Sequence, residues 1–263
     1  MATGQKPAGI PDDAPGKVKR GHMNEGEAFI RAVVDNPGDD THRLVYADWL
    51  DDRSDPRGPY LRAETERVKS PTAAAKKKLD KLAERLDALW VARVSRPPVG
   101  VCVEAKLFRH PPGLTTATAI EAVARKYKVE FPPDYRAFLL NYNGGGFLYP
   151  PAWMGGELNE HAYIEFFGGL KLVKKSEFLD LEVFAESLYE GSDDINRGSA
   201  LFPIGGPDQE HTIYLLGIRD QYRGHVYTHA DQCMQWIGHD WLSKKSESFA
   251  ALLAELAAQT GEE

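Results

Sequence analysis

The densest group of potential metal ligands in the sequence lies near the C-terminus. It consists of His225, His229, Cys233 and His239. Imidazole and thiolate groups suit zinc, and spacings of four would place the first three on one face of a helix. However, Val226, Tyr227 and Thr228 favour a strand, along which positions four apart are separated by about 13 Å at ~3.3 Å per residue. One ion cannot be held by ligands so far apart, so we predict no metal site and no cofactor.

Carboxylates that could do acid–base chemistry are concentrated in one third of the chain. They are Glu157, Glu160, Glu165, Glu182, Glu186, Glu190, Asp193 and Asp194. Paired carboxylates hydrolyse glycosides only at a suitable separation, which sequence spacing does not determine. A hydrolase built on them would have a deep pocket lined by two or more carboxylates with shifted pKa values. The Gly-x-Ser-x-Gly motif is also absent. We therefore interpret the cluster as solvated surface and predict no enzymatic activity.

Three consecutive glycines at positions 144–146 raise the question of phosphate binding. A phosphate loop needs glycines between a strand and the N-terminus of a helix. Here they follow a predicted helix that begins at Pro132 or Pro133, and no Lys-Ser or Lys-Thr pair comes after them. Asn143-Gly144 instead matches a helix C-cap, because glycine tolerates the left-handed conformation. We predict that these glycines end the helix and turn the chain.

Charge is distributed unevenly along the 263 residues, whose formal net charge is −7. Residues 1–99 contain 18 Lys and Arg against 16 Asp and Glu, whereas residues 100–263 contain 14 against 23, or −9. Such an acidic half repels phosphate backbones, so we predict no nucleic-acid partner and favour a basic protein partner. The alternative is that the acidity only maintains solubility. The run 76–78 of lysines has no interleaved aromatic residues and indicates the outer face of a helix.

The sequence also lacks signals for membranes and secretion. No stretch approaches the roughly 18 consecutive apolar residues of a membrane span. Residues 1–22 are rich in Gly, Pro, Lys and Asp without an apolar central region, so we expect a disordered leader and not a signal peptide. Cys102 and Cys233 stand alone and are interpreted as reduced thiols. We predict a cytoplasmic protein without a membrane partner.

The elements expected up to residue 96 are all helical. Apolar periodicity predicts helices near 24–35, 41–52 and 60–69. A long helix should follow Pro71, because Leu79, Leu82, Leu86 and Leu89 form a heptad-like seam. Asp48 and Arg57 are expected to form an ion pair that holds the turn at 54–58. Residues 23–96 are therefore predicted to be a helical module, and 97–113 a proline-rich linker or short strand.

Helices and strands mix in the remainder of the chain. Short helices are predicted at 120–127 and 135–142, with further helices at 176–189 and from 248. Strands are predicted at 163–167, 201–204, 212–218 and 225–228. No regular alternation of strand and helix is present, so the predicted class is α+β: an all-helical N-terminal module followed by a mixed sheet flanked by helices.

The second half resembles the SMI1/KNR4 family, the core of the SUKH superfamily, over about residues 114–258. The motifs that carry the resemblance are Phe131-Pro132-Pro133-Asp134-Tyr135 with Phe138-Leu139 and Asn143-Gly144-Gly145, then Phe202-Pro203-Ile204-Gly205, Gly224-His225-Val226-Tyr227, and Ser248-Phe249 with Leu252-Leu253. One departure is the segment 207–210, where many members have a more glycine-rich turn. The SUKH-like domain is expected to extend over 114–260.

The helical module resembles a different family, the bacterial repeat-companion domain, over about residues 24–65. The similarity lies in Glu27-Ala28-Phe29, in the run Arg43-Leu44-Val45-Tyr46-Ala47-Asp48-Trp49-Leu50, and in Asp55-Pro56-Arg57-Gly58. That domain occurs at the N-terminus of varied multidomain proteins and has no established biochemical role. The resemblance therefore implies a modular protein and nothing more specific.

The SMI1/KNR4 resemblance implies a protein that binds another protein. Bacterial members commonly serve as immunity proteins that bind and neutralise toxin domains, which here predicts an acidic surface against a basic toxin domain. The alternative is a scaffold or regulatory adaptor whose two modules recruit different partners. We expect partner contacts after the glycines, where aromatic residues alternate with carboxylates. The candidates are Tyr149, Trp153, Glu157 and Glu160, although a core position for Trp153 is an equal alternative.

Overall fold

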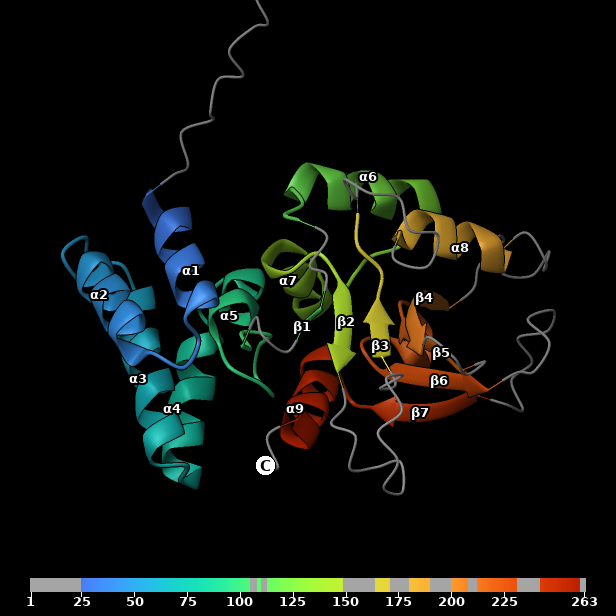
Figure 1. Ribbon diagram of the computed structural model, residues 1–263. Coiled ribbons are helices and arrows are strands. Elements are labelled where there is room, and N and C mark those ends of the chain that lie inside the picture. Colours follow the sequence, from blue (N-terminus) through green and yellow to red (C-terminus); the bar gives the residue numbers. More distant parts are fainter. Residues whose placement is uncertain are drawn as a thin grey trace, which may run out of the picture.

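A computed structural model describes residues 25–104, 108–109, 113–148, 164–170, 180–189, 200–207, 212–230 and 242–260. Its first part is a bundle of helices, and its second part is an antiparallel sheet with helices packed around it (Figure 1). The predicted α+β class, with an all-helical N-terminal region before a sheet, is confirmed.

The helical part forms where the apolar periodicity predicted it. Its helices are α1 (Glu25–Asp35), α2 (Asp40–Asp51), α3 (Arg57–Lys69), α4 (Ala73–Ala83) and α5 (Ala88–Val94). Side chains cap three of them, since Asp39 accepts a hydrogen bond from the backbone N–H of Thr41, and Thr72 and Asp87 do the same for α4 and α5. Such caps satisfy N–H groups that have no partner inside the helix.

The prediction of one long helix after Pro71 is wrong. The chain forms α4 and α5 instead, separated by a turn at 84–87. Asp87 has extended backbone geometry, and its carboxylate accepts a hydrogen bond from the backbone N–H of Trp90, so it starts a new helix. The leucine spacing continues across the turn because Leu79 of α4 is in the core, and Leu82 of α4, Leu86 of the turn and Leu89 of α5 pack against it. Because both helices pack against the same core, the leucine spacing in the sequence resembles that of one continuous helix.

An ion-pair network lies inside the helical part. The side chains of Arg43 and Glu64 are both fully buried, with 3.4 Å between Arg43 Nε and Glu64 Oε2. Arg96 donates to Glu64 from its backbone N–H and from Nη1, and its Nη2 donates to Asp40 at 2.7 Å. Arg43 also donates to the carbonyl of Pro37 and to Cys102 Sγ. These contacts tie α2 and α3 to the segment after α5.

The predicted ion pair between Asp48 and Arg57 is wrong. Arg57 binds Asp55, two residues earlier, with 2.6 Å between Nη2 and Oδ2. Asp48 pairs instead with Arg62 on α3 at 2.6 Å. Both Arg57 and Arg62 were possible partners of Asp48, and the packing of α2 against α3 brings Arg62 to it.

The sheet contains seven strands in the part of the chain that the structure describes. They are β1 (Phe108–Arg109), β2 (Gly145–Leu148), β3 (Ile164–Phe167), β4 (Leu201–Pro207), β5 (Thr212–Gly217), β6 (Val226–Ala230) and β7 (Leu242–Ser246). The strands are antiparallel and follow one another in chain order, so each pairs with its neighbours in sequence. The four predicted strands correspond to β3, β4, β5 and β6.

Two strands were missed by the sequence analysis. β2 begins at Gly145, so the second and third of the three glycines belong to a strand that pairs with β3. β7 has the sequence Leu-Ser-Lys-Lys-Ser and is mostly exposed, so it shows no apolar alternation. It lies at one edge of the sheet, where exposed lysines discourage pairing with another chain.

Helices α6 (Ala117–Tyr127), α7 (Pro133–Asn141), α8 (Leu181–Tyr189) and α9 (Phe249–Thr260) pack around this sheet (Figure 1). Alternate residues of the central strands face them: Phe202 contacts Tyr127 of α6, and Phe167 contacts Phe138 of α7 and Phe249 of α9. The intervening positions of β4, β5 and β6 form a second, smaller apolar cluster. Its buried members are Leu201, Ile213, Leu215 and Tyr227. Both faces of these strands are thus apolar.

The helical part and the sheet part share one hydrophobic core. Arg93 of α5 forms a two-point ion pair with Glu27 and donates from Nε to the side chain of Asn141 at the end of α7. Asn141 in turn donates to the carbonyl of Arg93. In the predicted linker, Val101, Cys102 and Val103 are buried, and among its described residues only 108–109 form a strand. The two parts are therefore joined by packed and hydrogen-bonded contacts.

Two buried tyrosines of this region allow a test of that joint. Tyr142 exchanges hydrogen bonds with the N–H and C=O of Val103 at 2.8 and 2.9 Å, whereas the Tyr135 hydroxyl is buried without a hydrogen-bond partner among the described residues. We expect Tyr142→Phe to lower the free energy of unfolding by about 1–3 kcal/mol, because it leaves backbone groups of Val103 unpaired. Tyr135→Phe should change it by less than about 1 kcal/mol in either direction. Urea denaturation of both variants is the measurement, and equal losses would contradict this assignment.

No helix among the described residues is long and apolar enough to cross a membrane.

Candidate protein-binding surfaces

The four predicted partner contacts, Tyr149, Trp153, Glu157 and Glu160, lie outside the described residues. The structure describes the strands on either side of them. β2 ends at Leu148 and β3 begins at Ile164, and these two residues are register partners. The segment 149–163 therefore connects the paired ends of two adjacent strands within the sheet.

Two of the clustered carboxylates share one cation. Lys126 of α6 binds Glu182 at 3.1 Å and Glu186 at 2.6 Å, both on α8. The hydrogen bond and charge of Lys126 hold the pKa of Glu186 below its usual range. A general acid needs a raised pKa, so the direction of this shift does not favour that role for Glu186. The arrangement instead joins α6 to α8 and leaves one uncompensated negative charge at the surface.

The histidines do not supply a metal centre in the described part of the chain. His225 precedes β6, and its Nδ1 lies 2.9 Å from the backbone oxygen of Glu247. His229 lies in β6, as the strand prediction required, while Cys233 and His239 lie outside the described residues. Among the residues that are described, no three His, Cys, Asp or Glu side chains gather closely enough to hold a metal ion.

The motif residues at 131–143 connect elements of the fold. The carboxylate of Asp134 accepts hydrogen bonds from the N–H groups of Tyr135 and of Ala250, so it caps the first turn of α9 from a distance. Burial raises the pKa of Asp134, and the backbone hydrogen bonds act in the opposite direction. Asn143 donates to the carbonyl of Leu170 and accepts from its N–H, both at 2.8 Å. These polar residues hold α7 against α9 and against the end of β3.

Gly144 has a specific packing role. Its φ is +91°, and a Cβ atom there would lie 2.5 Å from the carbonyl oxygen of Phe167 and 2.7 Å from the N–H of Gly169. Only glycine permits that backbone angle together with this close approach. Asn143 also has positive φ, at 56°. Asn143 and Gly144 lie in the turn after α7, as predicted, whereas Gly145 and Gly146 belong to β2.

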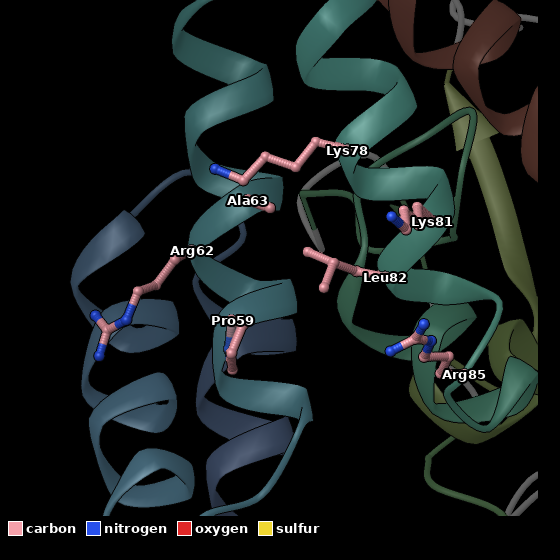
Figure 2. A pocket seen from close by; sticks show the side chains of 7 residues that line it. All are labelled: Pro59, Arg62, Ala63, Lys78, Lys81, Leu82 and Arg85. Carbon is pink, nitrogen blue, oxygen red and sulfur yellow. The ribbon is translucent and has the colours of Figure 1, made fainter.

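A basic groove of about 480 Å³ lies between α3 and α4 and was not anticipated from the sequence. Its lining residues are Pro59, Arg62, Ala63, Lys78, Lys81, Leu82 and Arg85. Figure 2 shows Leu82 pointing from α4 toward α3, and Lys78 reaching across toward Ala63. The sequence signal was the spacing of Lys78, Lys81 and Arg85, which repeats by three and four and so places these cations on one face.

The comparisons with known proteins concern the second half of the chain. The family model described as SMI1 / KNR4 family (SUKH-1) matches residues 114–255, which is 142 of the 263 residues. A search of curated proteins found no match. The matched range begins just before α6 and ends within α9, so it contains strands β2–β7 and the helices packed on them. The resemblance of the helical part to the repeat-companion domain stays a prediction. Since more than half of the residues match, the chain belongs to the SMI1/KNR4 (SUKH-1) family.

Proposed function

We propose that this chain is a bacterial immunity protein that binds a toxin domain and neutralises it by covering the surface that the toxin needs. Family membership over residues 114–255 is the observation that carries the proposal. The excess of acidic residues after position 100, 23 against 14 basic ones, supports a basic partner. Complementary charge would speed association and orient the two proteins. The proposal requires binding alone, without a reaction or a cofactor, and places the protein in the cytoplasm.

The proposed binding surface includes the segment between β2 and β3. Tyr149 and Trp153 would supply the apolar centre of the interface, with Glu157 and Glu160 at its rim. The strands on either side of this segment pair with each other, which supports it as a binding element, because paired strands fix where the segment begins and ends. In this proposal the domain responsible spans 114–260, and the helical module at 23–96 has a separate role.

The test uses toxin domains encoded next to this gene. Calorimetry with the purified full chain should give a complex, and co-expression should restore growth of cells that produce the toxin. Glu157→Lys with Glu160→Lys should weaken binding about tenfold or more and reduce its dependence on salt. Glu25→Lys with Asp52→Lys is the matched control, because both residues are exposed, lie on the helical part and produce the same change in net charge.

Two outcomes would contradict the immunity function. The first is the absence of any complex with the neighbouring toxin domains while the chain is folded. The second is a complex that forms but leaves the toxin fully active. Capture of several endogenous partners, with no toxin gene nearby, would favour the alternative function of a scaffold or regulatory adaptor. The basic groove between α3 and α4 favours this alternative, because it gives the helical part a binding surface separate from the one proposed for the SUKH-like domain.

A further inference from the structure

The groove between α3 and α4 combines positive charge with an apolar floor, and we propose that it binds an acidic peptide segment of a partner protein. The proposal does not rest on the immunity function, because α3 and α4 lie outside the family match at 114–255. It assigns a binding role to the helical part, for which nothing else in the chain indicates a function.

The cations of the groove are of two kinds. Arg62 is held by Asp48 and Asp51 of α2, each at 2.6 Å, and Lys78 is held by Glu66 at 2.7 Å. Both cations are therefore fixed in place. The charge of Lys78 is compensated, whereas Arg62 faces two carboxylates, which leaves one negative charge on the α2 side of the groove. Lys81 and Arg85 are exposed and form no ion pair with any other described residue.

No carboxylate is among the lining residues, so Lys81 and Arg85 give the groove a net positive charge. On a chain whose net charge is −7, such a site attracts an anionic partner and repels a cationic one. Figure 2 shows Arg85 and Leu82 on the same side of α4, facing α3. A carboxylate that binds Arg85 would therefore lie beside the apolar floor.

The apolar floor of the groove limits which kind of anionic partner would fit it. Pro59 and Ala63 of α3 lie opposite Leu82 of α4, and together they offer a small apolar surface. From Lys78 to Arg85 there are seven steps of ~1.5 Å, or about 10 Å, which is about two helical turns of a partner. A peptide with an apolar side chain between two carboxylates would satisfy both the floor and the free cations. Inorganic phosphate would leave the floor uncovered.

Nucleic acid fits the groove less well than an acidic peptide. No aromatic residue lines it, so unpaired bases would have no surface on which to stack. The carboxylates of Asp48, Asp51 and Glu66 flank it through their ion pairs with Arg62 and Lys78. Every nucleotide carries a negative charge, so a strand that extends past the groove would meet these carboxylates, whereas a peptide can have uncharged residues at those positions.

The experiment measures fluorescence anisotropy of the full chain with a labelled 14-residue helical peptide that contains four glutamates and leucines spaced by four. Three further probes are the same peptide with Gln for Glu, the same peptide with Ser for Leu, and a 15-nucleotide single-stranded DNA. We expect the acidic peptide to bind most tightly. Lys81→Glu with Arg85→Glu should weaken its binding at least about tenfold, because two attractive contacts become repulsive.

The matched control is Lys76→Glu with Lys77→Glu, which makes the same change of charge on α4 at residues that do not line the groove. Its affinity should stay within about twofold of the unaltered chain, and circular dichroism should show that both variants are folded. The proposal is overturned if the acidic peptide does not bind, if both double variants weaken it equally, or if the glutamine peptide binds as tightly. Tighter binding of the DNA, or competition by a second copy of this chain, would assign the groove to those occupants instead.

Discussion

Replacement of Glu64 by glutamine is expected to lower the free energy of unfolding by about 3–5 kcal/mol, because it leaves a buried positive charge without its counterion. Glu64 is fully buried and lies between two arginines, 3.4 Å from Arg43 Nε and 3.0 Å from Arg96 Nη1. Arg96 retains its ion pair with Asp40, but Arg43 has no other carboxylate partner among the described residues. Urea denaturation followed by circular dichroism gives the change directly.

The same helix supplies the control for this prediction. Glu66 also forms an ion pair, with Lys78 at 2.7 Å, but both side chains are more than half exposed. Glu66→Gln should therefore cost at most about 1 kcal/mol. The double variant Arg43→Met with Glu64→Met should recover much of the loss, since apolar replacement of a buried pair is often neutral. If Glu64→Gln and Glu66→Gln cost the same, burial does not govern the strength of this network.

Gly144→Ala is expected to be the second severe substitution, with a loss of about 2–5 kcal/mol. A left-handed backbone angle costs a residue with a Cβ atom roughly 1–2 kcal/mol. The new Cβ would also lie 2.5 Å from the carbonyl oxygen of Phe167, and displacing packed backbone costs about 1–3 kcal/mol more. The thermal midpoint and the urea midpoint of the variant should both fall.

Gly224→Ala separates the two contributions. Gly224 has a similar φ of +84°, but a Cβ there would meet no atom within 4 Å. This variant should lose only the conformational part, about 1–2 kcal/mol. The difference between the two variants then measures the close approach of Gly144 to β3. Equal losses would mean that the backbone near Phe167 moves aside, contrary to the packing seen here.

Local signals predicted the helices better than the strands. The boundaries of α1, α2, α6 and α7 follow from apolar periodicity and from caps within a few residues, because helical hydrogen bonds join residues close in sequence. The strands β2 and β7 were missed because their partners lie elsewhere in the chain. β2 begins with glycines that resemble a turn, and β7 is a largely exposed edge. Neither has the alternation by which a strand is recognised.

Of the two candidate binding surfaces, one was predicted from the sequence and the other was not. The predicted contacts at 149–160 were chosen for residue type, and they stay a prediction. The basic groove depends on the distance between α3 and α4, which no spacing within one helix contains. The long helix predicted after Pro71 would have contained both Lys78 and Arg85. That prediction did not indicate that Pro59 and Ala63 of α3 lie opposite them.

The amino-acid sequence by itself determined the α+β class, the helical ends marked by Asn143 and Gly144, and the motifs of the SMI1/KNR4 family. Each of these depends on short-range periodicity or on residues adjacent in the chain. Tertiary structure alone decided which charges meet between helices: Asp48 with Arg62, and Arg43 with the buried Glu64. The physical reason is that several partners of opposite charge lie within reach of each long side chain, and only the packing of apolar faces selects among them.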